Sequence, residues 1–168
     1  MKPNLDGLQN VYIHPGEACF SSKPIIVSTV LGSCLSIVMF SKKIKYAGFS
    51  HCMLPNCREC NLNCDKCNER FRYVDCTIEF MIKKFQKMQI QTKDIEVKIF
   101  GGADVLKTTS NEKRISTVGR QNIEMAINTF AKFNMPIATS DVGGTNGRKI
   151  FFLTENGEVY LNRLKNNG

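Results

Sequence analysis

The sequence of 168 residues has no apolar run long enough to cross a bilayer and no internal repeat. A membrane-spanning helix needs about 20 apolar residues, and the N-terminus lacks the charged-then-apolar pattern of a secretory signal. No linker-like segment divides the chain, and its length suits one domain with a sizeable core. We therefore expect a single cytoplasmic domain over residues 1–168, without membrane insertion.

Two further absences narrow the function classes. Gly101-Gly102 and Gly143-Gly144 lack the lysine–serine pair or G-x-G-x-x-G context of a phosphate-binding loop, so we expect tight turns there. Nearby Asp141 and Arg148 can form a structural ion pair or contact a substrate.

The net charge of +8 favours acidic partners. No basic–aromatic recognition segment appears, which disfavours nucleic-acid binding and leaves it a minor alternative.

The apolar pattern predicts a mixed α/β (α+β) domain, rich in strands and with two main helices. Apolar residues recur at spacings of three and four over 73–89, which is typical of an amphipathic helix. A second helix is expected over about 120–133, with Thr117 as its upstream cap. Strands are expected at 11–13, 18–21, 25–28, 35–40, 45–50, 95–100, 136–141, 150–153 and 159–163.

One cysteine and one histidine flank a predicted β-hairpin. Cys34 precedes the run 35–40, His51 follows the run 45–50, and Lys42-Lys43 separates the two runs. With a two-residue loop at these lysines, Cys34 pairs with His51, and opposed Cβ atoms lie about 5 Å apart. An imidazole at that distance would lower the thiol pKa from about 8.5 toward roughly 4–7 and make Cys34 a nucleophile.

The cysteine–histidine pattern alone leaves two interpretations open. Free cysteine is often a buried core residue, which is the plainer interpretation of Cys34. Gly32 favours the nucleophile, because glycine allows close backbone approach and successive N–H groups in such a turn can face a developing oxyanion. The local pattern therefore suggests a cysteine hydrolase. His14, before Pro15-Gly16, is interpreted as a strand-end residue.

Four of the eight cysteines lie in one short segment, 56–68, as two C-x-x-C pairs. Such pairs are typical of tetrahedral zinc sites, so Cys57, Cys60, Cys64 and Cys67 are the predicted metal ligands. The pairs are closer together than in ordinary zinc ribbons, which keeps an iron–sulfur cluster and an unmetallated or redox-active set open. Disulfides are disfavoured in a reducing cytoplasm. Lacking partners at ligand spacing, three others are expected in the core: Cys19, Cys52 and Cys76.

Five blocks in order, over about residues 11–164, together resemble the chemoreceptor glutamine deamidase family (CheD) of bacterial chemotaxis. They are Leu31-Gly32-Ser33-Cys34, His51-Cys52-Met53-Leu54-Pro55, Phe100-Gly101-Gly102-Ala103-Asp104, Val118-Gly119-Arg120-Gln121-Asn122, and Asp141-Val142-Gly143-Gly144 with Gly147-Arg148-Lys149. The resemblance implies packed β-sheets flanked by helices, similar to the deamidase domain of cytotoxic necrotizing toxins. Segment 56–68 is an insertion relative to the family pattern.

The resemblance also implies an activity, with no catalytic cofactor. Family members hydrolyse glutamine side chains on the cytoplasmic helices of chemoreceptors to glutamate and ammonia. It assigns Cys34 as the nucleophile that forms a thioester, His51 as general base and acid, and Ser28, next to Thr29, as the third polar residue. A CheC-type phosphatase is an implied partner, and the alternative function is a module that binds receptors or CheC with little catalysis.

Overall fold

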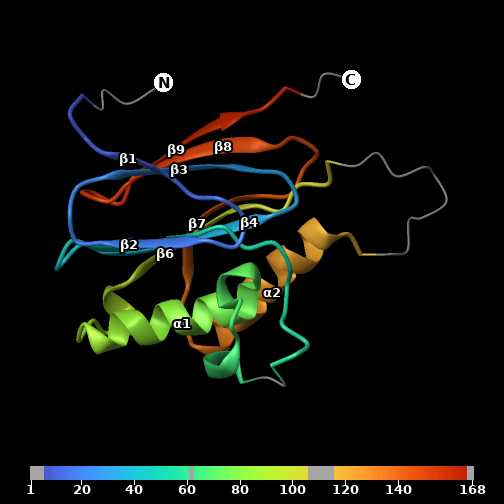
Figure 1. Ribbon diagram of the computed structural model, residues 1–168, viewed down its shortest axis with the longest axis horizontal. Helices are drawn as coiled ribbons and strands as arrows, with labels where there is room; N and C mark the ends of the chain where they lie inside the picture. Colours follow the sequence, from blue (N-terminus) through green and yellow to red (C-terminus); the bar gives the residue numbers. More distant parts are fainter. Residues whose placement is uncertain (1–5, 61–62, 106–115, 166–168) are drawn as a thin grey trace.

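The computed structural model describes residues 6–60, 63–105 and 116–165 and stacks two β-sheets on a layer of helices (Figure 1). The four-stranded sheet has the order β1 (Asn10–Tyr12), β3 (Ile26–Leu31), β8 (Arg148–Leu153), β9 (Val159–Arg163). The five-stranded sheet has the order β2 (Ala18–Ser21), β5 (Tyr46–Ser50), β4 (Leu35–Ser41), β6 (Glu96–Gly101), β7 (Ile137–Val142). The predicted mixed α/β architecture of packed sheets and helices is confirmed.

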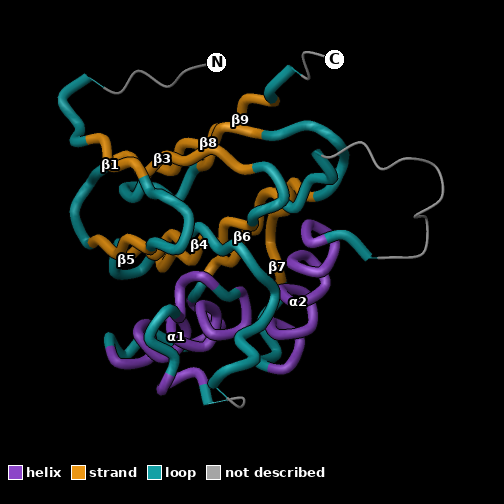
Figure 2. Tube along the Cα trace, turned by 45° about the vertical axis from the view of Figure 1, so that its right-hand side comes forward, coloured by secondary structure: helices purple, strands orange, loops and turns teal. Residues whose placement is uncertain are grey.

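Two α-helices of the described residues, α1 (Val74–Lys87) and α2 (Val118–Lys132), cover the outer face of the five-stranded sheet (Figure 2). Both match the predicted segments, and the Thr117 hydroxyl accepts a hydrogen bond from the Arg120 N–H as the expected cap. Short 3-10 helices occur at Cys64–Lys66, Arg70–Arg72 and Thr92–Asp94. Neither α-helix has the length and apolarity needed to cross a membrane, nor does any shorter helix of the described residues.

Strand β4 is buried on both faces because it lies between the other sheet and the helices. Ile37 and Met39 pack in the core shared with α1 and α2, whereas Val38 and Phe40 pack in the core between the sheets. This alternation follows from the two-residue period of a strand. Side chains on the second face therefore meet residues of β3 in the space between the sheets.

The hairpin of β4 and β5 forms as predicted, but its predicted register is wrong by two residues. Val38 pairs with Phe49, and Ser41 pairs with Tyr46, so the turn spans 42–45. Lys45 adopts a positive φ of 54°, which closes this longer turn. A shift of two keeps each side chain on its predicted face. Continued to the end of the hairpin, however, the register no longer pairs Cys34 directly with His51.

We predict that Phe85→Ala lowers the free energy of unfolding by about 3–5 kcal/mol. Phe85 is a residue of α1 whose side chain is fully buried, and its ring centroid lies 4.9 Å from that of Tyr46. Truncation therefore leaves a cavity. The control is Met88→Ala at the end of the same helix, where the side chain is 46% exposed. Its effect should stay within about 0.5 kcal/mol. Urea unfolding measures both, and equal effects would contradict this packing.

Candidate active site

His51 is buried between the two sheets, just beyond the end of β5. Its Nδ1 lies 2.7 Å from Thr29 Oγ1 of β3, and that hydroxyl donates to the Ile13 carbonyl oxygen at 2.6 Å. A hydroxyl has one proton to donate, so Thr29 must accept the second hydrogen bond from Nδ1–H. The neutral imidazole therefore carries its proton on Nδ1 and leaves Nε2 unprotonated.

The unprotonated Nε2 of His51 is buried and has no hydrogen-bond partner among the described residues. Burial lowers the pKa of His51 from 6.5 to about 4, which outweighs the opposing effects of the Ile13 carbonyl and the Glu17 carboxylate. At neutral pH the ring is thus uncharged and offers a single free lone pair. A buried polar atom without a partner is costly, which marks Nε2 as a candidate proton acceptor.

The hydroxyl on the imidazole belongs to Thr29 and not to Ser28, which corrects the contact expected for the third residue. Ser28 is buried too, but its hydroxyl donates to Asn10 Oδ1 at 3.2 Å. Successive side chains of a strand point to opposite faces. Thr29 shares its face with Val27 and Leu31, which pack between the sheets, so it is Thr29 that reaches His51.

Cys34 lies in the turn between β3 and β4, half-buried, and packs against the core between the sheets. It lines a largely apolar cavity of about 420 Å³. The other lining residues are Ser33, Met53, Leu54, Arg72, Ala103, Asp104, Val105, Thr117, Val118 and Gly119. His51 is not among these lining residues, but it precedes Met53 of the cavity wall by two residues in the sequence.

The environment of Cys34 acts against the lowered thiol pKa that the sequence predicts. Burial raises the pKa of the Cys34 thiol. The imidazole of His51 supplies no positive charge to oppose this effect, because it is neutral and its Nε2 makes no hydrogen bond within the described part of the chain. Burial therefore favours the uncharged form of both side chains over an ion pair.

Two carbonyl groups of the Cys34 turn accept hydrogen bonds from the residues that follow β6. The Gly102 N–H donates to the Cys34 oxygen at 2.8 Å, and the Ala103 N–H donates to the Gly32 oxygen at 2.9 Å. By contrast, the N–H groups of Ser33 and Cys34 donate to no acceptor in the described residues. Free N–H groups beside the sulfur are what an oxyanion hole requires.

Asn122 joins the two segments of the site, and the sequence interpretation missed this role. Its Nδ2 donates to the Ser33 carbonyl oxygen at 3.0 Å and to the Met53 carbonyl oxygen at 3.1 Å, and the side chain is fully buried. The sequence does indicate that Asn122 is buried, because it lies four residues before Ala126 and eight before Phe130, on the buried face of α2.

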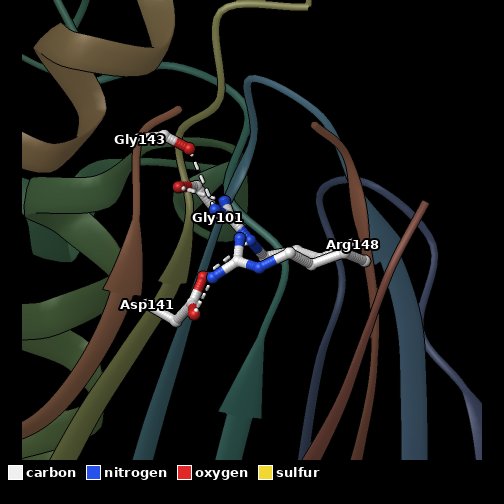
Figure 3. Close-up of polar contacts among 5 residues, drawn as sticks. Gly101, Asp141, Gly143 and Arg148 are labelled. Atoms are coloured by element: carbon white, nitrogen blue, oxygen red, sulfur yellow. Dashed lines mark hydrogen bonds and ion pairs between the residues drawn. The ribbon is translucent and has the colours of Figure 1, made fainter. Parts of the chain in front are cut away.

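A buried arginine, Arg148, lies beside Gly101, Gly143 and Asp141 (Figure 3). Arg148 donates to the carbonyl oxygens of Gly101 at 2.7 Å and Gly143 at 2.9 Å, and its Nε lies 3.0 Å from Asp141 Oδ1. Gly101 has a φ of +112°, and a Cβ there would lie 2.2 Å from the Cys34 carbonyl oxygen. Of the two roles left open for Asp141 and Arg148, the structure shows the ion pair.

The cysteines of segment 56–68 gather with Cys76 of α1 into a second cluster of thiols, which corrects the expectation that Cys76 has no such partners. Cys60 and Cys76 have sulfurs 3.8 Å apart, and those of Cys57 and Cys67 are 3.6 Å apart. Two groups of three sulfurs, Cys57/Cys67/Cys76 and Cys60/Cys64/Cys76, are close enough to hold a metal ion. Residues 61 and 62 of the segment lie outside the described residues.

The chain is similar to known proteins over most of its length. Residues 53–163 match the family model described as CheD chemotactic sensory transduction. A probable chemoreceptor glutamine deamidase CheD 2 of Geobacter sulfurreducens is 40% identical, over 94% of this chain and 91% of its own. A probable chemoreceptor glutamine deamidase CheD of Maridesulfovibrio salexigens is 32% identical over 98% of each chain.

Two solved structures share the fold. Both have a TM-score of 0.50: the hypothetical protein YfiH of Bacillus licheniformis, 9% identical, and YlmD of Geobacillus stearothermophilus, 14% identical. The similarity covers 77% and 89% of this chain, respectively. It covers 51% and 61% of those proteins, so this chain spans between half and two thirds of their length. At this identity the similarity concerns the architecture alone.

We predict that His51 remains neutral, with its proton on Nδ1, from neutral pH down to about pH 4. ¹⁵N NMR of the labelled protein measures both the tautomer and the titration. A proton on Nε2, or a midpoint near 6.5, would contradict the assignment.

The same shift predicts a pH dependence of stability. The unfolded chain binds this proton near pH 6.5 and the folded chain only near pH 4, so the unfolded state holds more protons between these values. The contribution of His51 to the free energy of unfolding should be complete above pH 6.5 and be lost as the pH falls toward 4.

Proposed function

We propose that this chain, which belongs to the CheD family, is a protein-glutamine deamidase acting on the cytoplasmic helices of chemoreceptors. The observation that carries the proposal is the His51 imidazole, which Thr29 fixes with an unprotonated, unpartnered Nε2. In the sequence, His51 lies two residues before Met53, which lines the same cavity as Cys34. The relatives named as probable chemoreceptor glutamine deamidases support the choice of substrate.

The first half-reaction begins from the neutral pair. As a glutamine side chain enters the cavity, Nε2 of His51 takes the proton of the Cys34 thiol, and the sulfur attacks the carboxamide carbon. The free N–H groups of Ser33 and Cys34 would bind the oxyanion that develops on the carboxamide oxygen. The protonated ring then gives its proton to the departing amide nitrogen, so that ammonia leaves and a thioester remains on Cys34.

The second half-reaction uses the same groups in reverse order. His51 takes a proton from water, and the resulting hydroxide attacks the thioester carbon. The bond from carbon to Cys34 sulfur breaks, the sulfur recovers a proton from the imidazolium, and glutamate leaves. Thr29 accepts from Nδ1–H throughout, so the ring keeps one tautomer and one orientation in both steps.

The surroundings of the site suit this substrate. The apolar walls of the cavity can receive the aliphatic stem of a glutamine, and the net charge of +8 favours acidic receptor surfaces. Since the substrate helices are cytoplasmic, we place the protein in the cytoplasm. A CheC-type phosphatase is the proposed protein partner, on the strength of the family membership.

We also propose that the cysteine cluster binds structural zinc in preference to an iron–sulfur cluster. Thiolate ligands in a tetrahedral arrangement suit zinc, whose metal–sulfur bonds are about 2.3 Å long. Cys57, Cys60, Cys64 and Cys67 are the loop ligands that the sequence predicts, and the thiols lie close to one another in the fold. The metal would have no part in the deamidation itself.

We predict that Cys34→Ala abolishes the conversion of glutamine to glutamate in a receptor cytoplasmic fragment, because Cys34 is the thiol that lines the cavity and would form the thioester. Mass spectrometry of the fragment measures the conversion. The matched control is Cys19→Ala, which removes a half-buried thiol from β2 and should leave the conversion intact. Conversion by Cys34→Ala would place the chemistry elsewhere. Receptor binding without conversion by the wild type would support a binding module instead.

We predict that Thr29→Val reduces kcat strongly, whereas Ser28→Ala leaves it close to the wild-type value. Valine preserves the shape of threonine but removes the hydroxyl oxygen that accepts from the buried Nδ1–H, so the ring loses the contact that fixes its tautomer. The loss should fall within the roughly 10²–10⁴-fold that a positioned acid–base group contributes. Thr29→Ser, which keeps a hydroxyl, should recover part of the rate. The reverse ranking of the two positions would assign the role to Ser28.

A further inference from the structure

Cys76 lies where the two groups of loop sulfurs meet. It is the third residue of α1 and is fully buried. Among the described residues, each set of three sulfurs within 4.8 Å of one another includes Cys76: one set adds Cys57 and Cys67, and the other adds Cys60 and Cys64. Among the described residues, each compact set of three sulfurs therefore depends on Cys76 of α1.

We propose that Cys76 is a metal ligand, together with thiolates from both C-x-x-C pairs. Metal–sulfur bonds of about 2.3 Å in a tetrahedral site put neighbouring sulfurs about 3.8 Å apart. The distance from Cys60 to Cys76 is 3.8 Å, and that from Cys57 to Cys67 is 3.6 Å. Both sets of three draw one cysteine from each pair, so either set places the ion between the loop and the helix.

The chemistry of the cluster suits a soft or borderline divalent cation such as Zn²⁺. Each thiol that binds the ion gives its proton to the solvent, so binding should strengthen as the pH rises. A cavity of about 410 Å³ opens onto Cys57, Cys60 and Cys67 and provides an entry path. Because α1 is packed against the sheet, it offers a ligand whose position is fixed before the ion binds.

Ligation by Cys76 would hold segment 56–68 to α1, close in sequence to residues that line the cavity next to Cys34. The two ends of the loop are already paired, since Leu54 bridges Tyr73 and the Arg72 carbonyl oxygen accepts from the N–H groups of Met53 and Leu54. Met53, Leu54 and Arg72 line the cavity next to Cys34. A metal bound to Cys76 and to loop cysteines would join the same loop to α1 at a second point.

The decisive measurement identifies the ligands in the wild-type protein. The chain is loaded with ¹¹³Cd²⁺ in place of zinc, and a proton–cadmium correlation spectrum records couplings from the ion to the Cβ protons of each ligand cysteine. We expect a coupling to Cys76 as well as to loop cysteines. Couplings to loop cysteines alone would overturn the inference while leaving the proposed metal site intact. Absence of cadmium binding would overturn both.

Zinc affinity in variants gives an independent measurement, by competition with a chromophoric chelator. Cys76→Ser should weaken binding as much as the more damaging of Cys57→Ser and Cys60→Ser does, since one of these two belongs to each set. The loss should exceed the roughly 10–100-fold seen when an outer-shell partner is mutated. Cys19→Ser, outside the cluster, should bind zinc as the wild type does. Wild-type affinity in Cys76→Ser would overturn the inference.

The inference rests on the proposed metal site and not on the proposed deamidase. Cys34→Ala should therefore bind zinc with wild-type affinity, whether or not the wild type converts receptor glutamines. Conversely, loss of zinc binding in Cys76→Ser with the Cys34 nucleophile still reactive would separate the two sites. Reduced zinc affinity in Cys34→Ala would contradict the separation.

Discussion

The hydrogen bond between Thr29 and His51 is the interaction on which the geometry of the site depends. It joins β3 of the four-stranded sheet to the residue that follows β5 of the five-stranded sheet, and both residues are buried. The single hydroxyl proton is committed to the Ile13 carbonyl, which leaves Thr29 as an acceptor only. Packing of the two sheets therefore decides which ring nitrogen is free, and the same contact that joins the layers sets the tautomer of the imidazole.

The turn that carries Cys34 depends on other buried polar groups. Asn122 of α2 binds carbonyl oxygens on both segments of the site, and Arg148 of β8 holds the Gly101 turn against the Cys34 backbone. Hydrogen bonds in a buried environment are costly to break, because the abandoned partner cannot turn to water. The four-stranded sheet contributes Thr29 and Arg148, and the helical layer contributes Asn122. These groups contact segments at the end of the five-stranded sheet, so the site is a property of the three-layer arrangement and not of one motif.

The sequence predicts local structure better than it predicts contacts. All strands and both main helices lie within a few residues of their predicted positions, because apolar periodicity reports which face each element buries. The hairpin register differs because a four-residue turn with Lys45 at positive φ is not evident from a Lys-Lys pair. The shift is an even number, so His51 and Cys34 keep the face that burial requires.

The contacts that escaped prediction are tertiary. Ser28 and Thr29 are neighbours in sequence but face opposite sides of β3, and the layer each side meets is decided by the whole fold. Cys76 lies nine residues beyond Cys67, outside any ligand spacing, yet the return of the loop onto α1 brings it among the other thiols. Asn122 resembles any polar residue of a helix until α2 is placed over the Cys34 turn.

A neutral resting pair has consequences for how such a site would work. A thiolate–imidazolium pair in this buried setting would carry a desolvation penalty for both charges, which the Glu17 carboxylate only partly offsets at His51. Keeping the proton on sulfur avoids this penalty and leaves the cysteine poorly reactive toward oxidants, since the thiolate is the reactive form. In the proposed mechanism, charge appears only once a carboxamide carbon and the N–H groups of Ser33 and Cys34 are in place to receive it. Substrate binding, and not the resting thiol pKa, then determines when Cys34 becomes a nucleophile.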